Sequence, residues 1–477
     1  MYLAGIDLGT TGCKSMVFDG SGNIAGSHYI EYDLIFTPLG VEQDAGLWWD
    51  HAKTALKEAM RSAGIKGGEL KGIAVASQGI ASVLIDAQGI PLAPAISWYD
   101  NRADAEAKEI ALRYNDTHLF ETTGRHASSL MFPQVLHLKR SNSALYERAV
   151  YFLMAQDYLV YRLCGTAVTD YTMASGTLCF DAGRHCWIDE MFDHYGIDQK
   201  RFPAVKPFGA AAGKLLPAVA HELGLSEDTV VAVGMQDQKA AALGSGITIS
   251  AGIITLSLGT ASAVSRLVSE KITDESGRLN CHAFDSRRWI TENYVGASGA
   301  SLKWLRSTLF ANQTYNELDN MALQSGAGAG GVFFIPALDE KRGEFYGLSL
   351  TTTAGDLVRS VLEGIAYGVK NCVDIQNEVL HTNAGELRVY GGGAASDLWC
   401  QILADVLLIP VTTPRTQETS NLGAAICAGM ACGLFADEAS LAAFIGKTGK
   451  TFLPDPANAK SYEEGYRKFI KIRDKMI

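Results

Sequence analysis

Residues 2–12 read Tyr-Leu-Ala-Gly-Ile-Asp-Leu-Gly-Thr-Thr-Gly, an apolar run that ends in a turn of glycines and threonines. Residues 13–19 and 23–32 follow as two further runs of strand-forming residues, so this opening predicts strands joined by tight turns. Residues 45–63 then have helical spacing, and residues 72–76 return to a strand pattern. The stretch therefore predicts an antiparallel hairpin followed by a helix and another strand.

The same pattern recurs near the middle of the chain. Residues 253–258 form an apolar run, residues 259–262 read Gly-Thr-Ala-Ser, and a second strand-like run follows. The repeat distance is far longer than the period of a solenoid, so we expect two similarly folded domains, 1–246 and 247–477, with the boundary within 244–250. Strands followed by alternating helices and strands predict an α/β class with mixed sheets.

The bulk composition narrows the class of protein. A chain of 477 residues is too long for one ordinary core, which also favours two domains. The formal net charge of -11 argues against nucleic acid or an anionic membrane as the main partner. The nine cysteines are scattered without a C-x-x-C pair, so we expect reduced thiols. With no apolar stretch near ~18 residues and a carboxylate at Asp7, we expect a cytoplasmic protein.

The glycine–threonine turns have a chemistry of their own. Backbone amides and threonine hydroxyls that face the same way make an anion site, and glycine lets the backbone approach phosphate oxygens. One such turn is equally well explained as a tight hairpin with a capping threonine. Two of them at the head of two similar halves favour a polyphosphate ligand.

Two carboxylates stand out beside these turns. Asp7 lies on a strand, where a carboxylate is costly unless it serves a cation or a hydrogen-bond network, and Mg²⁺ held through water is the natural cation beside phosphate. Asp237 follows the apolar run 230–233 and opens an alanine-rich segment that predicts a helix. A helix N-terminus stabilises an anion by about 0.3–1 kcal/mol. A satisfied strand-end carboxylate and a helix N-cap are the structural alternatives.

These segments together resemble one family. Residues 5–11 resemble the first phosphate motif of the actin, hexokinase and sugar-kinase superfamily, residues 258–262 the second, and residues 391–394 the adenosine motif. Residues 343–363 match the C-terminal signature of the FGGY carbohydrate kinases. The chain is identified as a member of that family over nearly its whole length.

The resemblance implies a fold and a division of labour. It implies two ribonuclease H-like, actin-type α/β domains with mixed sheets flanked by helices and an ATP cleft between them. The first domain is expected to bind mainly the sugar and to carry the first phosphate turn and the catalytic Asp237, and the second to bind mainly the nucleotide. The implied reaction is ATP-dependent phosphorylation of a hydroxyl of a sugar or polyol, with ATP and Mg²⁺ as cofactors.

The resemblance also assigns individual residues. Asp237 is the expected general base, and Asp7 the expected ligand of Mg²⁺ through water. The positions expected to bind ATP and its phosphates are Asp7, Gly9, Thr10, Thr11, Lys14, Gly259, Thr260, Gly299, Lys303, Gly392, Gly393 and Ser396. The positions expected to bind the substrate are Gln78, Trp98, Asp100, Asp237 and Gln238.

The identity of the substrate stays open at this stage. The general pattern is closer to xylulose kinases than to glycerol kinases, which favours a ketopentose. However, Gly79 and Ile80 stand where xylulose kinases carry Met-His and glycerol kinases Arg-Glu, so weak activity on D-xylulose and weaker activity on glycerol are expected from this loop. Gluconate, glycerol or erythritol, ribulose and other ketoses are the alternatives.

Other departures keep different functions open. Gln134 and His137 stand where the family's N-terminal signature usually has Lys and Trp. An inactive family member and an actin- or chaperone-like ATPase are the remaining alternatives to a kinase. No nucleic-acid or membrane partner is expected, and a homodimer is one expectation for the assembly.

Overall fold

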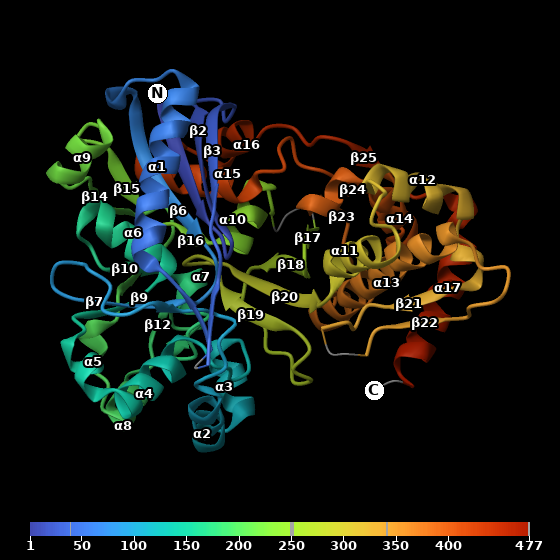
Figure 1. Cartoon of the computed structure of the whole chain (residues 1–477), viewed down its shortest axis with the longest axis horizontal. Coiled ribbons are helices and arrows are strands. Elements are labelled where there is room, and N and C mark those ends of the chain that lie inside the picture. Colours follow the sequence, from blue (N-terminus) through green and yellow to red (C-terminus); the bar gives the residue numbers. More distant parts are fainter. Residues whose placement is uncertain (39, 249–251, 340–341, 476–477) are drawn as a thin grey trace. The chain divides into compact units, whose positions relative to one another are not determined.

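The structure is a computed structural model that describes residues 1–38, 40–248, 252–339 and 342–475 (Figure 1). Two compact units make up the chain. The first contains Met1–Gly246, Val268–Ile290 and Glu418–Gly446, and the second contains Ile247–Leu267, Thr291–Gln417 and Lys447–Ile477. The first unit therefore takes back two segments from the second half of the chain. Part of the expected boundary, residues 249 and 250, lies outside the described residues.

The first unit is built on a mixed sheet. Its strands follow the order β14-β15-β6-β1-β2-β3, and β16 also pairs with β6. The central strand β1 runs antiparallel to β2 and parallel to β6. The bounds are β1 (Tyr2–Leu8), β2 (Gly12–Asp19), β3 (Ile24–Glu31), β6 (Leu70–Ser77), β14 (Ala211–Lys214), β15 (Val230–Ala232) and β16 (Met235–Gln236).

Helices cover this sheet on both faces. Because side chains alternate along a strand, Ile6 and its alternate neighbours of β1 join the apolar core that contains Trp48 of α1 (Ala45–Ala63). The other face of β1 meets α15 (Thr419–Ala431). A Cβ at Gly5 would lie 2.1 Å from the carbonyl oxygen of Asn421, so only glycine allows this approach. The Asn421 amide in turn donates to the Gly5 oxygen at 3.0 Å.

The remaining elements of the first unit surround that sheet. A five-stranded sheet has the order β4-β5-β8-β7-β9. The bounds are β4 (Ile35–Thr37), β5 (Gly40–Gln43), β7 (Ser82–Ile85), β8 (Ala95–Ile96), α2 (Asp104–Tyr114), α3 (Asp116–Thr123), α4 (Met131–Ser141), α5 (Ser143–Arg148), β9 (Tyr151–Met154), α6 (Ala155–Cys164), β10 (Val168–Asp170), α7 (Tyr171–Ala174), β11 (Phe180–Asp181), β12 (Cys186–Trp187), α8 (Asp189–Tyr195), β13 (Ala204–Lys206), α9 (Pro217–Leu223), α10 (Asp237–Gly244), β19 (Asn280–Ala283) and α16 (Glu438–Ile445).

The second unit repeats the central arrangement of the first. Its strands follow the order β20-β18-β17-β23-β24-β25, and β17 is antiparallel to β18 and parallel to β23. The bounds are β17 (Ile253–Leu258), β18 (Ser262–Val268), β20 (Trp289–Val295), α11 (Ser298–Leu309), α12 (Tyr315–Ser325), β21 (Phe333–Ile335), β22 (Glu344–Tyr346), α13 (Ala354–Leu380), β23 (Glu386–Tyr390), α14 (Asp397–Leu407), β24 (Val411–Thr412), β25 (Thr451–Phe452) and α17 (Pro456–Arg473). The predicted α/β class with mixed sheets is confirmed.

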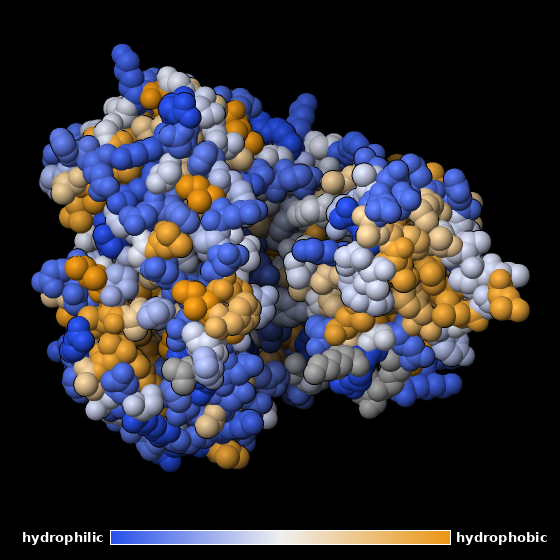
Figure 2. Space-filling view, in the orientation of Figure 1, coloured by the Kyte–Doolittle hydropathy of each residue, from blue (hydrophilic) through white to orange (hydrophobic). Residues whose placement is uncertain are grey.

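The surface and the cysteines agree with a globular protein. The face shown in Figure 2 is mostly hydrophilic, with apolar groups between hydrophilic ones. Among the described helices, none is long and apolar enough to cross a membrane. Each of the nine cysteines is a free thiol, and Cys164, Cys186 and Cys432 are partly exposed.

Candidate active site

In the first glycine–threonine turn the backbone carbonyls accept hydrogen bonds from the protein, whereas two backbone amides make none with the described residues. The Tyr32 hydroxyl donates to the Gly9 oxygen, the Gln43 side chain donates to the Thr10 oxygen at 2.8 Å, and the Tyr32 amide donates to the Thr11 oxygen at 3.1 Å. The amides of Thr10 and Thr11 donate to no protein atom within the described residues. Two adjacent unpaired donors, with every nearby carbonyl occupied, make a concave anion site.

In the second turn the carbonyls are also occupied, here by backbone amides of α11. The Gly299 amide donates to the Gly259 oxygen at 2.8 Å, and the Ala300 amide donates to the Thr260 oxygen at 3.1 Å. The first turn of α11 therefore holds the carbonyls, and the amides of Thr260 and Ala261 have no acceptor in the part of the chain that the structure describes. This turn is a second candidate anion site.

The glycines at these places differ in the space around them. A Cβ at Gly299 would lie 2.4 Å from the Gly259 oxygen, so this glycine serves the packing of α11 against the turn. A Cβ at Gly9 or Gly259 would meet its nearest described atom at 3.4 or 3.5 Å, and one at Gly392 would meet no described atom within 4 Å. The described part of the fold leaves space for a side chain at these three positions, and that space is open to a ligand.

A cavity of about 810 Å³ lies beside the second turn. Its volume falls within the 300–1,000 Å³ typical of small-molecule sites. The expected residues Gly259, Thr260, Gly299, Lys303, Gly392, Gly393 and Ser396 all line it. The Ser396 hydroxyl also caps α14 by accepting from the Trp399 amide at 3.0 Å. The structure thus brings together every nucleotide position that was predicted in the second half.

Several lining residues were not among the positions assigned from the sequence. Trp304 of α11 and Tyr315, Asn316 and Asp319 of α12 also line the cavity. Burial raises the pKa of the Asp319 carboxyl, and the Ser396 hydroxyl partly offsets this. The three α12 residues share one helical face, but an amphipathic surface helix carries the same spacing, so no sequence signal singles them out.

Three parallel strand ends gather the catalytic candidates of the first unit. β6 pairs with β1 on one side and with β16 on the other, and Ser77 is opposite both Leu8 and Gln236. Because the carboxyl ends of parallel strands meet at one edge, Asp7, Gln78 and Asp237 converge there. Asp237 is the first residue of α10, and its Oδ1 accepts from the Gln238 amide at 2.6 Å.

The Asp7 carboxyl is held in an unfavourable environment for a charge. Its pKa is raised to about 7, chiefly by burial and then by the neighbouring charge of Asp237. The Ser420 hydroxyl and the Lys14 ammonium oppose this rise, and Glu418 adds to it. Oδ1 of Asp7 is buried and has no hydrogen-bond partner among the described residues.

This environment fits a divalent cation. An ion beside Asp7 would satisfy the orphaned oxygen and offset the repulsion from Asp237. No group of three or more His, Cys, Asp or Glu side chains that could hold a metal occurs within the described residues. Mg²⁺ suits such a site, because it keeps several waters and is usually bound by one or two carboxylates together with substrate phosphates.

The substrate candidates differ in how far they are accessible. Trp98 is 39% exposed, stacks on Tyr99 with ring centroids 3.8 Å apart, and donates from its indole nitrogen to the Thr10 hydroxyl at 3.1 Å. Gln238 is half-exposed beside Asp237. Both can therefore reach a ligand near the first turn.

Gln78 and Asp100 are buried instead. The Gln78 amide donates to Gln43 at 3.0 Å, which links it to the first turn, while its Oε1 is buried without a partner in the described chain. Asp100 accepts from the Val41 amide at 2.6 Å and from the Arg102 guanidinium at 2.9 Å. Its oxygens thus hold the strand β5 and the 97–102 segment together.

Lys14 is paired rather than extended towards a ligand. Its ammonium lies 2.8 and 2.9 Å from the two carboxylate oxygens of Glu418. Glu418 precedes α15, so this ion pair helps to place that helix against β2.

The unusual loop positions also have structural partners. Ile80 is 4% exposed and belongs to the apolar core of the first unit, and a Cβ at Gly176 would meet it at 2.2 Å. Gln134 is fully buried, accepts from the Ser82 hydroxyl at 2.6 Å and donates to the Ser129 oxygen at 2.9 Å. Ile80 and Gln134, which depart from the family pattern, are therefore buried and have partners inside the first unit.

The comparisons with known proteins agree with this geometry. The family model for the N-terminal domain of the FGGY family of carbohydrate kinases matches residues 2–244, and the model for the C-terminal domain matches residues 254–432. The chain belongs to the FGGY family of carbohydrate kinases. The family and the reaction class expected from the sequence are confirmed.

Individual relatives of this FGGY kinase have several names. A xylulose kinase of Staphylococcus epidermidis is 30% identical, with 98% of this chain and 95% of that protein covered. A gluconokinase of Bacillus subtilis is 24% identical, with 99% and 95% covered. The solved structure of a ligand-bound xylulose kinase from Lactobacillus acidophilus matches with a TM-score of 0.91 and 25% identity, covering 100% of this chain and 98% of that one.

Proposed function

We propose that this FGGY kinase transfers the γ-phosphoryl group of ATP to a hydroxyl of a sugar or polyol, with Asp237 as the general base. The observation that carries the proposal is the convergence of Asp237, Asp7 and the unpaired amides of the first turn at one strand edge. A base, a cation ligand and an anion site are the parts that phosphoryl transfer needs.

Asp237 has the position that a general base requires. The carboxylate stands at the first residue of α10, next to the helix N-terminus, and the Gln238 amide donates to its Oδ1, which fixes its position. As the new O–P bond forms and the bond to the leaving phosphate breaks, the hydroxyl proton passes to Asp237. The amides of Thr10 and Thr11 are aimed at charge that develops on phosphate oxygens. Mg²⁺, when bound near Asp7, would neutralise phosphate charge.

The nucleotide is assigned to the second unit. We infer this from the 810 Å³ cavity, whose walls combine the amide-presenting turn with the partly exposed rings of Trp304 and Tyr315. An aromatic wall suits a purine and a turn with unpaired amides suits phosphates. The first domain is then mainly the sugar-binding one, with Trp98 as the apolar wall for a sugar ring.

A ketopentose is the proposed first choice of substrate. Relatives that carry the name xylulose kinase support it, and relatives named gluconokinase and glycerol kinase keep sugar acids and polyols as alternatives. Since Ile80 packs in the core and Gly79 has no side chain, this loop offers no polar side chain to either kind of substrate at these two positions. The weak activity on D-xylulose expected from this loop stays a prediction.

The setting of the reaction is also a proposal. ATP as a substrate and nine free thiols favour the cytoplasm. The homodimer expected from the sequence stays a prediction, and light scattering at several protein concentrations tests it.

A substrate panel tests the proposed function. ADP release is measured by a coupled assay with ketoses, polyols and sugar acids, each with and without Mg²⁺. We expect turnover to rise sharply with at least one sugar or polyol and to fall away when Mg²⁺ is chelated. ATP turnover that no member of the panel stimulates would contradict a kinase and favour an ATPase.

A further inference from the structure

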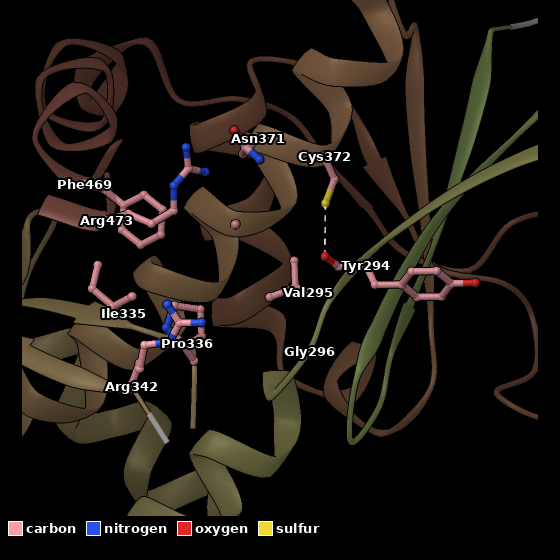
Figure 3. Close-up of a pocket in the computed structure, with 12 residues that line it drawn as sticks. Tyr294, Val295, Gly296, Ile335, Pro336, Arg342, Asn371, Cys372, Phe469 and Arg473 are labelled. Atoms are coloured by element: carbon pink, nitrogen blue, oxygen red, sulfur yellow. Dashed lines mark hydrogen bonds between the residues drawn. The ribbon is translucent and has the colours of Figure 1, made fainter. Parts of the chain in front are cut away.

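A second cavity of about 210 Å³ lies in the second unit, and it shares no lining residue with the nucleotide cavity (Figure 3). Its walls come from the end of β20, the segment after β21, α13 and the C-terminal helix α17. It is much larger than the roughly 10–15 Å³ that one water needs, yet smaller than the nucleotide cavity. A ligand of a few heavy atoms would fit it.

Three polar side chains that line this cavity can donate hydrogen bonds. Arg342 and Arg473 contribute guanidinium groups, Asn371 contributes an amide, and no Asp or Glu is among the described residues that line it. Figure 3 shows these three side chains coming from three different segments. Among the described residues the ionic side chains that line the cavity are two arginines, although the Asp339 carboxylate lies against the backbone of Gly296. In a chain with a net charge of -11, such a lining favours an anion.

Two of these groups have hydrogen-bond donors to spare. Arg473 donates from Nε and Nη2 to the Asp474 carboxylate at 3.0 and 2.8 Å, while its Nη1 makes no hydrogen bond with any described residue. The half-buried Asn371 side chain also has no hydrogen-bond partner in the described ranges. Planar guanidinium forks suit carboxylate and phosphate oxygens.

The rest of the lining is apolar. Val295, Ile335, Pro336 and Phe469 form walls around the polar groups. A bare inorganic ion would leave those walls uncovered, whereas a short organic body with charged ends would contact them.

The cavity is also connected to the nucleotide site through the backbone. Tyr294, Val295 and Gly296 line it, and α11 begins two residues later at Ser298. The Tyr294 oxygen accepts from the Cys372 thiol at 3.6 Å, which ties this wall to α13. The first amides of α11 hold the carbonyls of Gly259 and Thr260, so a shift of the wall would move the phosphate turn.

We propose that this cavity is a second binding site for a small organic dianion, a phosphate monoester or a dicarboxylate, and that its occupancy changes the affinity for the nucleotide. Arg473, Arg342 and Asn371 bind the charged ends, and Phe469 with its apolar neighbours contacts the body. By thermodynamic linkage the nucleotide changes the affinity for the dianion by the same factor.

Calorimetry on the full chain tests this. Methyl phosphate, succinate and inorganic phosphate are titrated in turn at constant ionic strength, with the nucleotide cavity first saturated by a non-hydrolysable ATP analogue. We expect one of the organic probes to bind, and Arg473→Ala to weaken it about tenfold or more. Asn371→Leu, which keeps the volume but removes the amide, should also weaken it. Arg467→Ala, on the same helix and 70% exposed, is the matched control and should change nothing.

The outcomes separate the parts of the proposal. No binding by either organic probe, or binding that Arg473→Ala and Asn371→Leu leave unchanged, would overturn the site. The affinity for the ATP analogue is then measured with and without the bound probe, and we expect a change of about fivefold or more. An unchanged analogue affinity would overturn the link to the nucleotide. Because binding is measured without turnover, these results do not depend on the proposed kinase activity.

Discussion

The two glycine–threonine turns use one backbone device in two electrostatic settings. In the first unit the strand before the turn carries Asp7, which pairs in register with Lys14 of β2. In the second unit the equivalent place holds Ser257, opposite Ala263. Side chains of Tyr32 and Gln43 hold the first turn, and the backbone of α11 holds the second.

Under the proposed function, that difference assigns binding to both turns and chemistry to the first. Both turns offer unpaired amides to an anion, but only the first stands beside two carboxylates that repel each other. A neutral turn is sufficient to hold phosphates. A turn beside Asp7 and Asp237 can also place a cation and a base, so the reaction is expected to depend most on the first unit.

The largest effect is expected at Asp237, the proposed general base. Asp237→Asn removes proton acceptance while keeping size and position, so turnover with sugar should fall roughly 10²–10⁴-fold. ATP affinity, measured by titration of a fluorescent analogue, should stay within about twofold. Asp228→Asn, at an exposed carboxylate of the same unit, is the control. A variant at residue 237 that kept more than half of its turnover would remove the catalytic distinction between the turns.

The next effect concerns the second turn. Gly259→Val places a branched side chain where the proposed function has the backbone meet phosphate, while the nearest described atom beyond the chain neighbours lies 3.5 Å from the new Cβ. ATP affinity should therefore drop about tenfold or more, which is the effect of losing one charge-assisted hydrogen bond. The melting temperature should stay unchanged. Gly20→Val, where nothing lies within 4 Å, is the control. Loss of sugar affinity alone, measured without nucleotide, would contradict the assignment.

A pH profile sharpens the role of Asp7. Its pKa of about 7 in the folded protein lies above the ordinary 3.8, so the carboxyl is protonated below neutral pH and must ionise to meet a cation. The apparent affinity for Mg²⁺ should fall by up to about tenfold per pH unit below 7. Asp7→Asn should abolish this dependence along with most of the activity. A Mg²⁺ affinity that is flat between pH 5 and 8, a range that extends about two units below and about one unit above the titration, would exclude the role.

The Asp7 carboxyl should affect folding stability in the opposite direction: Mg²⁺ affinity rises with pH, whereas stability without Mg²⁺ falls. Because the folded pKa exceeds the unfolded one, the folded state binds more protons between pH 3.8 and about 7, and Asp7 costs stability as the pH rises through that window. Without Mg²⁺, Asp7→Asn should therefore melt a few degrees above the parent at pH 8 and level with it near pH 4. Calorimetric scans at the two pH values provide the comparison, and a less stable variant at pH 8 would show that Asp7 is already well satisfied.

The smallest effect is expected for the hydrogen bond that joins Trp98 to Thr10 of the first turn. Trp98→Phe keeps an aromatic face but loses the 3.1 Å hydrogen bond to Thr10. We expect a rise in KM for the sugar of less than about tenfold with little change in kcat, as for one neutral hydrogen bond. Trp98→Ala should cost more because the face is lost as well. Equal effects of the two changes would mean that the ring itself contributes nothing.

Local features of the site could be predicted from the sequence. Both turns and the start of α10 at Asp237 depend on neighbours within a few residues, and glycine, threonine and alanine report those conformations directly. The roles expected for Asp7 and Asp237 came from family resemblance. The strand edge that brings them together was not predicted, because it depends on the long-range register of β1, β6 and β16.

Long-range partners could not be predicted in this way. Lys14 pairs with Glu418, which lies 404 residues further along the chain, and Asn421 bonds to Gly5 across 416 residues. Gln134, an apparent loss of a family lysine, is a fully buried amide that joins Ser82 and Ser129. Such contacts depend on tertiary packing, which neither periodicity nor turn chemistry encodes.

Because α15 belongs to the first unit but lies late in the sequence, the first unit cannot be completed until most of the chain has been synthesised. A nascent chain that ends at Gly246 lacks the helix that covers one face of β1, and this helix leaves the ribosome with residues 418–446 of the same unit. The interval of 200 residues (446 minus 246) corresponds to about 10–40 s at roughly 5–20 residues per second. During that time the face of the sheet around Gly5 stays uncovered, so the first half of the chain is the part that most needs a chaperone while translation continues.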